Sequence, residues 1–403
     1  MSLGIALKKG LKMDIGDLWR FGEEKFGLKK MLREIRDNRE RPQIPLATVL
    51  GSVMDMVALG QKSLLEVDQD GRRPGAKAWH GSKRRMVVSD STLERLLESV
   101  DLSDVRKMLH SAVRRAGADG ELKVMLPSGR KVCAGIVDSS DFGGVEGCVF
   151  AIAGVAAAPV DIKTHSKGKE LIASRLLLSE VRRTFGKGCV DVTIGDGLYI
   201  SKHHIRQCKE ELFCDAVVKT SEETLAIIQN AKGLFSLPPE PHDGIERLAG
   251  VDVNRGVKYR IIAARGFDWI GLPYEFKVAK VEEEKIKPKP GEEKFETFWV
   301  ITTDVDMSGL DMRELAHMRW VIENNVFKRL SELVGSKRGW IRNKRVKEAL
   351  LLLWFIGLLL LGYYLVSHGF AMLRKVYGAV KATWKYVTRI FRCSLEKFSM
   401  AKA

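Results

Sequence analysis

Three carboxylates occupy positions from which they could act together in catalysis. Asp138 ends the strand-like run AGIVD, Asp196 lies between two glycines after the strand-like VDVTI, and Glu323 falls in the helical stretch RWVIENNVFKRL. Carboxylate oxygens are the ligands that Mg²⁺ and Mn²⁺ prefer in proteins. Two such ions about 4 Å apart can activate an attacking oxygen and stabilise a departing one at a phosphodiester. The candidate chemistry is therefore metal-dependent cleavage or transfer of phosphodiesters.

Each acid also has an ordinary structural explanation. Asp138 could form a turn in DSSD, Asp196 could belong to an Asp-Gly turn, and Glu323 could pair with Arg319 one helical turn earlier. Asp141, in the same DSSD segment, is the rival to Asp138 as the first acid. We favour Asp138 because the alternation of apolar residues runs directly into it.

The helix that carries Glu323 has a mostly apolar face. At about 100° per residue, the side chains within roughly 60° of Glu323 are Ala316, Arg319, Trp320, Val326, Phe327 and Leu330. An ionised carboxylate withdrawn from water costs several kcal/mol unless a cation, a metal ion or hydrogen bonds compensate it. We therefore expect Glu323 to point inward and to bind a cation, which is either Arg319 or a metal ion.

The composition is that of a globular protein with excess positive charge. The chain has 403 residues, of which 45% are hydrophobic and 29% charged. Lys and Arg number 67 against 51 Asp and Glu, which gives a formal net charge of +16. The length allows two or three domains with a real core. The charge favours a polyanionic partner, nucleic acid or an anionic membrane, over a small metabolite.

Basic residues are clustered along the chain. The segment KRGWIRNKRVK contains six basic residues and no acid, and the loop after Gly71 and the tail after Ser367 are also basic. Candidate DNA-binding side chains in the first segment are Lys337, Arg338, Arg342, Lys344 and Arg345. Trp340 or Trp299 could stack on an unpaired base, although a tryptophan is more often a core residue.

Cysteine spacing and hydropathy indicate the compartment. The six cysteines form no CxxC pair and no Cys/His metal spacing, which predicts reduced thiols in a cytoplasmic protein, and the N-terminus lacks the pattern of a signal peptide. Residues 349–366 contain no charge and are near the minimum length of a membrane span. We favour a buried core helix there, because a sheet covered on both faces needs a helix of nearly uniform apolarity.

The order of the expected elements predicts an α/β protein. Residues 1–120 read as a helical DNA-binding domain, in which Ser91 and Glu94 have the spacing of a capping box. Residues 121–230 read as three strands, a helix, a strand, a helix capped by Ser201 and a strand, which predicts a mixed sheet with helices on its faces. Residues 231–297 read as a β-rich insertion, 298–370 as the rest of the core, and 371–403 as a basic helical tail.

These segments together resemble the DDE transposases of bacterial and archaeal insertion sequences, specifically the cut-and-paste group with a Y-R-E-K signature. IVDSS, TIGDGLY and RWVIENNVFKRL resemble the three catalytic blocks of that family. The resemblance implies a ribonuclease H-like sheet whose first and fourth strands lie side by side. It also implies two Mg²⁺ or Mn²⁺ ions held by Asp138, Asp196 and Glu323.

The same resemblance implies the partners. They are double-stranded DNA, as terminal inverted repeats and as target, and a second copy of the chain on paired ends. Arg319 and Lys328 would help to hold the DNA. The chain departs from the signature at two positions, with Ala316 in place of the tyrosine and Leu330 in place of the lysine. These departures leave open a catalytically degenerate DNA-binding regulator as an alternative. The uncharged run leaves open a second alternative, a membrane-associated protein anchored by residues 349–366.

Overall fold

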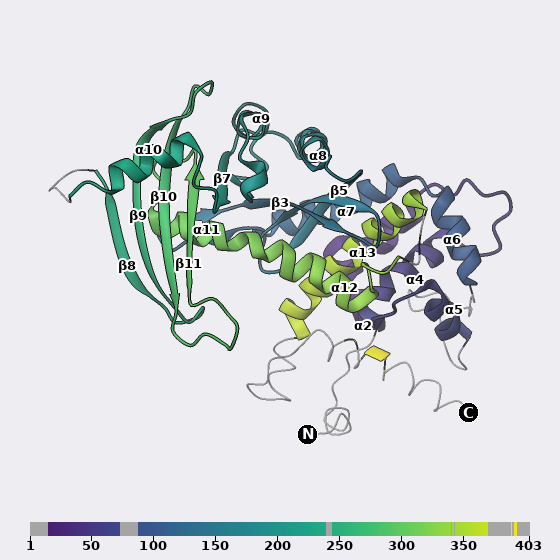
Figure 1. The fold of residues 1–403 in the computed structure, drawn as a ribbon. Helices are drawn as coiled ribbons and strands as arrows, with labels where there is room; N and C mark the ends of the chain where they lie inside the picture. The colour runs from purple at the N-terminus through teal and green to yellow at the C-terminus, as the bar shows by residue number, and fades with distance from the viewer. Residues whose placement is uncertain are drawn as a thin grey trace. The chain divides into compact units, whose positions relative to one another are not determined.

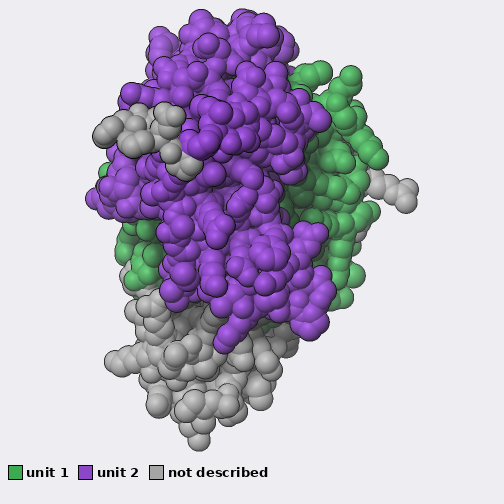
Figure 2. All heavy atoms as spheres, turned by 60° about the vertical axis from the view of Figure 1, so that its left-hand side comes forward, with its two compact units in different colours: residues 1–122, 139–173, 323–403 green, residues 123–138, 174–322 purple. Residues whose placement is uncertain are grey.

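The structure is a computed structural model that describes residues 15–72, 88–238, 244–339, 341, 343–369, 388, 391 and 392. The chain divides into two compact units, coloured separately in Figure 2. Unit 1 contains residues 1–122, 139–173 and 323–403, and unit 2 contains residues 123–138 and 174–322. The basic loop after Arg72, as far as residue 87, and almost all of the basic tail lie outside the described residues.

The helices described before the first strand all belong to unit 1. They are α2 (Ile15–Phe26), α3 (Leu28–Glu34), α4 (Leu46–Leu59), α5 (Leu64–Arg72), α6 (Asp90–Ser99) and α7 (Leu102–Ala118). The expected capping box at Ser91 is wrong. Ser89 is the N-cap of α6, and its hydroxyl accepts a hydrogen bond from the Thr92 amide at 3.3 Å. Ser91 already lies in the first turn, because the backbone is extended at Ser89 and helical from Asp90 onward.

The apolar helix α13 (Lys344–Tyr364) forms the centre of unit 1. It packs against α4, α6, α7 and β5 (Ala158–His165), and Figure 1 shows it running among these helices. A Cβ on Gly357 would lie 2.7 Å from the Met54 carbonyl oxygen, so α4 and α13 approach closely only because this residue is glycine. Among the described residues, one helix has the length and apolarity of a membrane span, and 94% of its apolar window is buried inside the protein. The prediction of a buried core helix is confirmed.

Nine strands form one mixed sheet in the order β5-β4-β3-β6-β7-β11-β10-β9-β8. The core strands are β3 (Ala134–Asp141), β4 (Glu146–Ile152), β5, β6 (Val192–Gly195) and β7 (Asp215–Thr220). The prediction of a mixed α/β sheet is confirmed, with α8 (Glu170–Phe185) and α9 (Lys202–Arg206) between core strands as expected. The first core strand, β3, lies parallel to the fourth, β6, and β6 lies parallel to β7. A short hairpin, β1 (Val124–Met125) with β2 (Lys131–Val132), precedes β3.

The predicted β-rich segment continues the same sheet. Its strands are β8 (Glu246–Asp252), β9 (Val257–Asp268) and β10 (Glu275–Lys285), and they join the core through β11 (Phe295–Thr302). One face is covered by α10 (Ala226–Phe235), whose Phe235 stacks on Trp299 at 6.1 Å (Figure 1). The other face is covered by α11 (Gly309–Ile322), whose His317 contacts Phe298 edge-on. Trp299 is 1% exposed, so it is a core residue and the alternative of base stacking is wrong for it.

Candidate functional site

Asp138 lies on β3 and is paired with Arg319. Its side chain is nearly buried, and Arg319 Nη1 donates to Asp138 Oδ2 at 3.2 Å. The Arg319 guanidinium also lies over the Trp320 ring at 4.8 Å. The alternative of a simple Arg319–Glu323 pair therefore does not describe this arginine, because it forms its ion pair with Asp138 on β3.

Asp196 directly follows β6 and caps a short 3₁₀ turn (Gly197–Tyr199). Its Oδ1 accepts a hydrogen bond from the Leu198 amide at 2.9 Å. The flanking glycines are required by close packing, since a Cβ on Gly195 would lie 2.8 Å from the Tyr199 side chain and one on Gly197 would lie 2.9 Å from Thr220 Oγ1. The side chain of Asp196 is half-buried. The Asp-Gly turn expected as the ordinary alternative exists, and it holds the carboxylate at the end of the strand.

The strand register brings the two aspartates to the same level. Ala134 pairs with Val192 and Ile136 with Ile194 on the parallel strands β3 and β6. Continuing that register by two residues sets Asp138 beside Asp196, with the strands about 4.8 Å apart. Asp141 is exposed three residues further along β3, and its Oδ1 accepts from the Gly144 amide at 2.7 Å to close the β3–β4 turn. Asp138, and not Asp141, is therefore the aspartate level with Asp196.

Glu323 begins a π-helical turn, η3 (Glu323–Phe327), between α11 and α12 (Lys328–Val334). The side chain is half-buried, and Ala316, Val326, Phe327 and Leu330 are buried as the apolar face predicted. Trp320 was expected on the same face but is 46% exposed. π turns of this kind occur frequently at functional sites.

The described residues contain no group of three or more His, Cys, Asp and Glu side chains arranged to hold a metal ion. Two aspartate carboxylates at one level of the sheet supply oxygen donors of the type that Mg²⁺ takes. Arg319 is the cation that neutralises one of them in this structure. The donor chemistry thus suits a hard divalent ion, although the arrangement of a complete ligand set is not present.

The candidate DNA-binding residues fall into three groups. Lys328, Lys337, Arg338 and Lys344 are exposed, whereas Arg342 and Trp340 lie outside the described residues. Arg345 has a structural task in unit 1, because its Nε donates to the Glu98 carbonyl at 2.7 Å and its Nη2 to the Val100 carbonyl at 2.9 Å. These two carbonyls belong to the C-terminal end of α6, where unpaired backbone acceptors favour a cation.

Lys347 is a buried structural residue, although the sequence places it in the basic segment KRGWIRNKRVK. Its side chain is buried, and its Nζ donates to the carbonyl oxygens of Ser336 at 2.9 Å and Arg338 at 3.4 Å. Burial lowers its pKa to about 8. The lysine therefore fixes the turn that presents Lys337 and Arg338. The sequence does contain a signal for its burial, because Lys347 stands two residues before the uncharged run 349–366, which is buried in the core.

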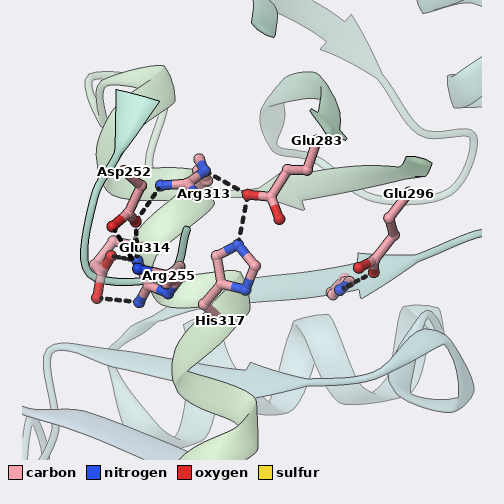
Figure 3. A network of polar contacts seen from close by, with 8 residues as sticks. Asp252, Arg255, Glu283, Glu296, Arg313, Glu314 and His317 are labelled. Atoms are coloured by element: carbon pink, nitrogen blue, oxygen red, sulfur yellow. Dashed lines mark hydrogen bonds and ion pairs between the residues drawn. The ribbon is translucent and has the colours of Figure 1, made fainter. Parts of the chain in front are cut away.

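An ion-pair cluster on α11 was also missed by sequence reasoning. Figure 3 shows Arg313, Glu314 and His317 of α11 reaching Asp252 of β8, Arg255 in the turn after β8 and Glu283 of β10. A groove of about 740 Å³ lies on the same four strands, β8 to β11, and Glu282, Glu284, Lys258 and Arg260 contribute to its lining. Carboxylates outnumber cations along this groove, so it does not complement a DNA phosphate backbone.

No family model matches this chain. No curated protein matches it either.

Proposed function

We propose that the protein is a metal-dependent DNA transposase of the DDE type, built on a ribonuclease H-like sheet. The observation that carries this proposal is the parallel pairing of β3 with β6, whose register, continued two residues beyond Ile136 and Ile194, sets Asp138 level with Asp196. The first and fourth core strands are the pair on which this family's first two acids are expected. The proposed substrate is double-stranded DNA, at the terminal inverted repeats of an element and at its target, with two copies of the chain on paired ends.

In this proposal, Asp138, Asp196 and Glu323 are the ligands of two Mg²⁺ or Mn²⁺ ions. Bound ions of this kind activate the attacking oxygen and stabilise the leaving oxygen of a phosphodiester. The chain's own groups have separate tasks. The Asp196 carboxylate is held at the end of β6 by the Leu198 amide, and Arg319 fixes the orientation of the Asp138 carboxylate through its Oδ2.

The exposed cations supply the DNA contacts in this proposal. Lys328, Lys337, Arg338 and Lys344 are exposed, and each phosphate contact that is removed should weaken binding to all sequences and reduce the salt slope by about one.

Water is the first nucleophile, at the end of the element, and the freed 3′-hydroxyl then attacks target DNA. The cytoplasm is the proposed compartment.

The test uses the full-length chain and DNA that carries the sequences flanking its reading frame. Asp138→Ala, Asp196→Ala and Glu323→Ala should each abolish cleavage in Mg²⁺ or Mn²⁺ while gel-shift binding of the DNA persists. Asp141→Ala is the matched control, because it removes an aspartate on the same strand that serves the turn, and it should still cut. Cleavage by the triple-alanine variant would show that the site is wrongly assigned.

A second candidate is a catalytically degenerate regulator that binds DNA without cutting it. Ala316 and Leu330, which stand where the signature has tyrosine and lysine, are both fully buried. Neither position can therefore offer a side chain to DNA. A strand-transfer assay in Mn²⁺, run beside gel-shift binding, separates the two candidates, since the regulator would bind specific DNA and join none of it.

A further inference from the structure

Glu283 of β10 accepts two hydrogen bonds from α11 through a single oxygen. Arg313 Nε lies 2.6 Å from Glu283 Oε1, and His317 Nε2 lies 2.8 Å from the same atom. The two donors are four residues apart and therefore share one face of the helix. In Figure 3 both side chains converge on the Glu283 carboxylate from α11.

Further contacts of Arg313 and Glu314 also hold α11 against the insertion strands. Arg313 Nη1 donates to Asp252 Oδ2 at 3.1 Å, and its guanidinium lies over the Tyr259 ring at 4.5 Å. Arg255, in the turn after β8, binds both oxygens of Glu314 at 2.7 and 2.8 Å and also reaches Asp252. Three consecutive insertion strands, β8 to β10, thus hold the first half of α11.

These charges are poorly screened by water. The side chains of Arg313 and Glu283 are only 5% and 6% exposed. The carboxylates of Asp252, Glu283 and Glu314 face the guanidinium groups of Arg255 and Arg313, and the His317 ring contacts Glu283. Burial raises the pKa of Glu283, but the hydrogen bond and charge of His317 and the charge of Arg313 lower it below its usual value. Removal of one carboxylate from such a cluster leaves buried cations uncompensated.

The same helix carries the partner of Asp138. Arg319 lies two residues after His317, and its Nη1 reaches Asp138 Oδ2. An α-helix is stiff over so short a distance, so its rotation about its own axis is common to all of these residues. A change of rotation that releases Glu283 would also turn Arg319 away from Asp138.

We infer that Glu283 is a positioning residue, which sets the rotation of α11 by holding Arg313 and His317 and thereby places Arg319 on Asp138. Its meaning for catalysis rests on the proposed function. The placement of Arg319 by Glu283 does not rest on the proposed function. All of the contacting residues belong to unit 2, and the placement can be tested by stability measurements alone.

The test is a triple-mutant cycle on the full-length protein. The coupling between Asp138→Asn and Arg319→Gln is measured from unfolding in denaturant, first in the wild-type background and then with Glu283→Gln. We expect the coupling to be lost with Glu283→Gln. Glu282→Gln is the matched control, since Glu282 is the adjacent residue, points to the opposite face of the sheet and pairs with Lys280. The coupling should persist in that background.

An undiminished coupling in the Glu283→Gln background would overturn the inference. If Glu283→Gln does not fold, His317→Leu replaces it, because this variant removes only one of the two bonds to Glu283 and leaves Arg313 in place. It should reduce the coupling partially, and an unchanged coupling would again overturn the inference.

Metal-dependent cleavage gives the second readout. Glu283→Gln and Arg319→Gln should each slow cleavage, and the double variant should be no slower than Arg319→Gln alone. Additive losses would show that Glu283 does not act through Arg319. A wild-type protein that cuts no cognate DNA would refute the proposed function, and the stability cycle would still decide whether Glu283 places Arg319.

Discussion

The ammonium group of Lys347 donates a hydrogen bond to the Ser336 carbonyl oxygen at 2.9 Å, at a depth where none of the lysine side chain reaches solvent. The Lys347 pKa is about 8 in the folded protein and about 10.5 in the unfolded chain. Below pH 8 the folded state contains the buried charge, and its full cost is present. Between pH 8 and 10.5 the folded state loses this proton first, which relieves the cost.

We therefore predict that Lys347 makes the free energy of unfolding rise between pH 8 and pH 10, relative to Lys347→Met. The difference should approach about 3 kcal/mol, since one pKa unit corresponds to about 1.4 kcal/mol. Denaturant unfolding of both proteins across this range measures it. The variant keeps the aliphatic stem and has no titrating group, so identical pH profiles would contradict the assignment of Lys347 as a buried, titrating lysine.

Gly143 and Gly144 form a matched pair in the β3–β4 turn. Both have positive φ angles, of 76° and 89°, but a Cβ on Gly143 would lie 2.5 Å from the Arg338 carbonyl oxygen, whereas one on Gly144 would meet open space. Gly144→Ala should cost about 1 kcal/mol of backbone strain. Gly143→Ala should cost clearly more, about 3 kcal/mol or above, because it adds a clash with backbone. Thermal unfolding of the two variants checks the order, and equal costs would be inconsistent with this packing.

Asp55 is a buried carboxyl whose ionisation opposes folding. Its Oδ1 accepts from Trp19 Nε1 at 2.7 Å, its Oδ2 has no partner among the described residues, and burial raises its pKa well above 3.8. The folded state retains the proton, so this group stabilises the fold at low pH and loses that contribution as pH rises above 4. Asp55→Asn should therefore be more stable than wild type at pH 7. Unfolding at pH 4 and 7 measures the gain, which must shrink at pH 4.

Arg345 and Lys344 should separate stability from DNA binding. Arg345 caps the end of α6 through the Glu98 and Val100 carbonyls, while Lys344 is exposed at the first residue of α13. Arg345→Gln should lower the unfolding free energy by about 1 kcal/mol. Lys344→Gln should leave it unchanged and reduce the salt slope of DNA binding by about one. A lower salt slope for Arg345→Gln without loss of stability would reverse the two roles.

The strands and the strand ends were predictable from the sequence. β3 is buried from Ala134 to Asp138 and β6 from Val192 to Gly195, so apolar runs mark both strands and the aspartates that follow these runs mark their ends. The helical face of Leu93, Leu96 and Leu97 on α6 was predictable for the same reason, since all three are buried. These patterns were predictable because burial of one face of a helix or strand sets the spacing of apolar residues within that element.

The partners of the charged residues were not predictable in the same way. Arg319 has an acid four residues away in the sequence, but its partner is Asp138, 181 residues earlier. Glu283 and His317 likewise come from elements whose contact depends on how the insertion joins the sheet. Tertiary packing decides which charged side chains meet. The spacing of hydrophobic residues along the chain does not predict those contacts. Lys347 was counted with the basic run for the same reason.

The π-helical turn at Glu323 constrains how this region can change in length. A π turn contains one residue more than the α-helical turn it replaces, so a single-residue deletion within 323–327 would restore regular α-helix and leave the later side chains close to their present directions. A single-residue deletion within α12 has no extra residue to remove. It would turn the side chains that follow it by about 100° and bring Leu333 out of the interior. Homologous sequences should therefore tolerate the loss of one residue at this turn more readily than the loss of one residue within α12.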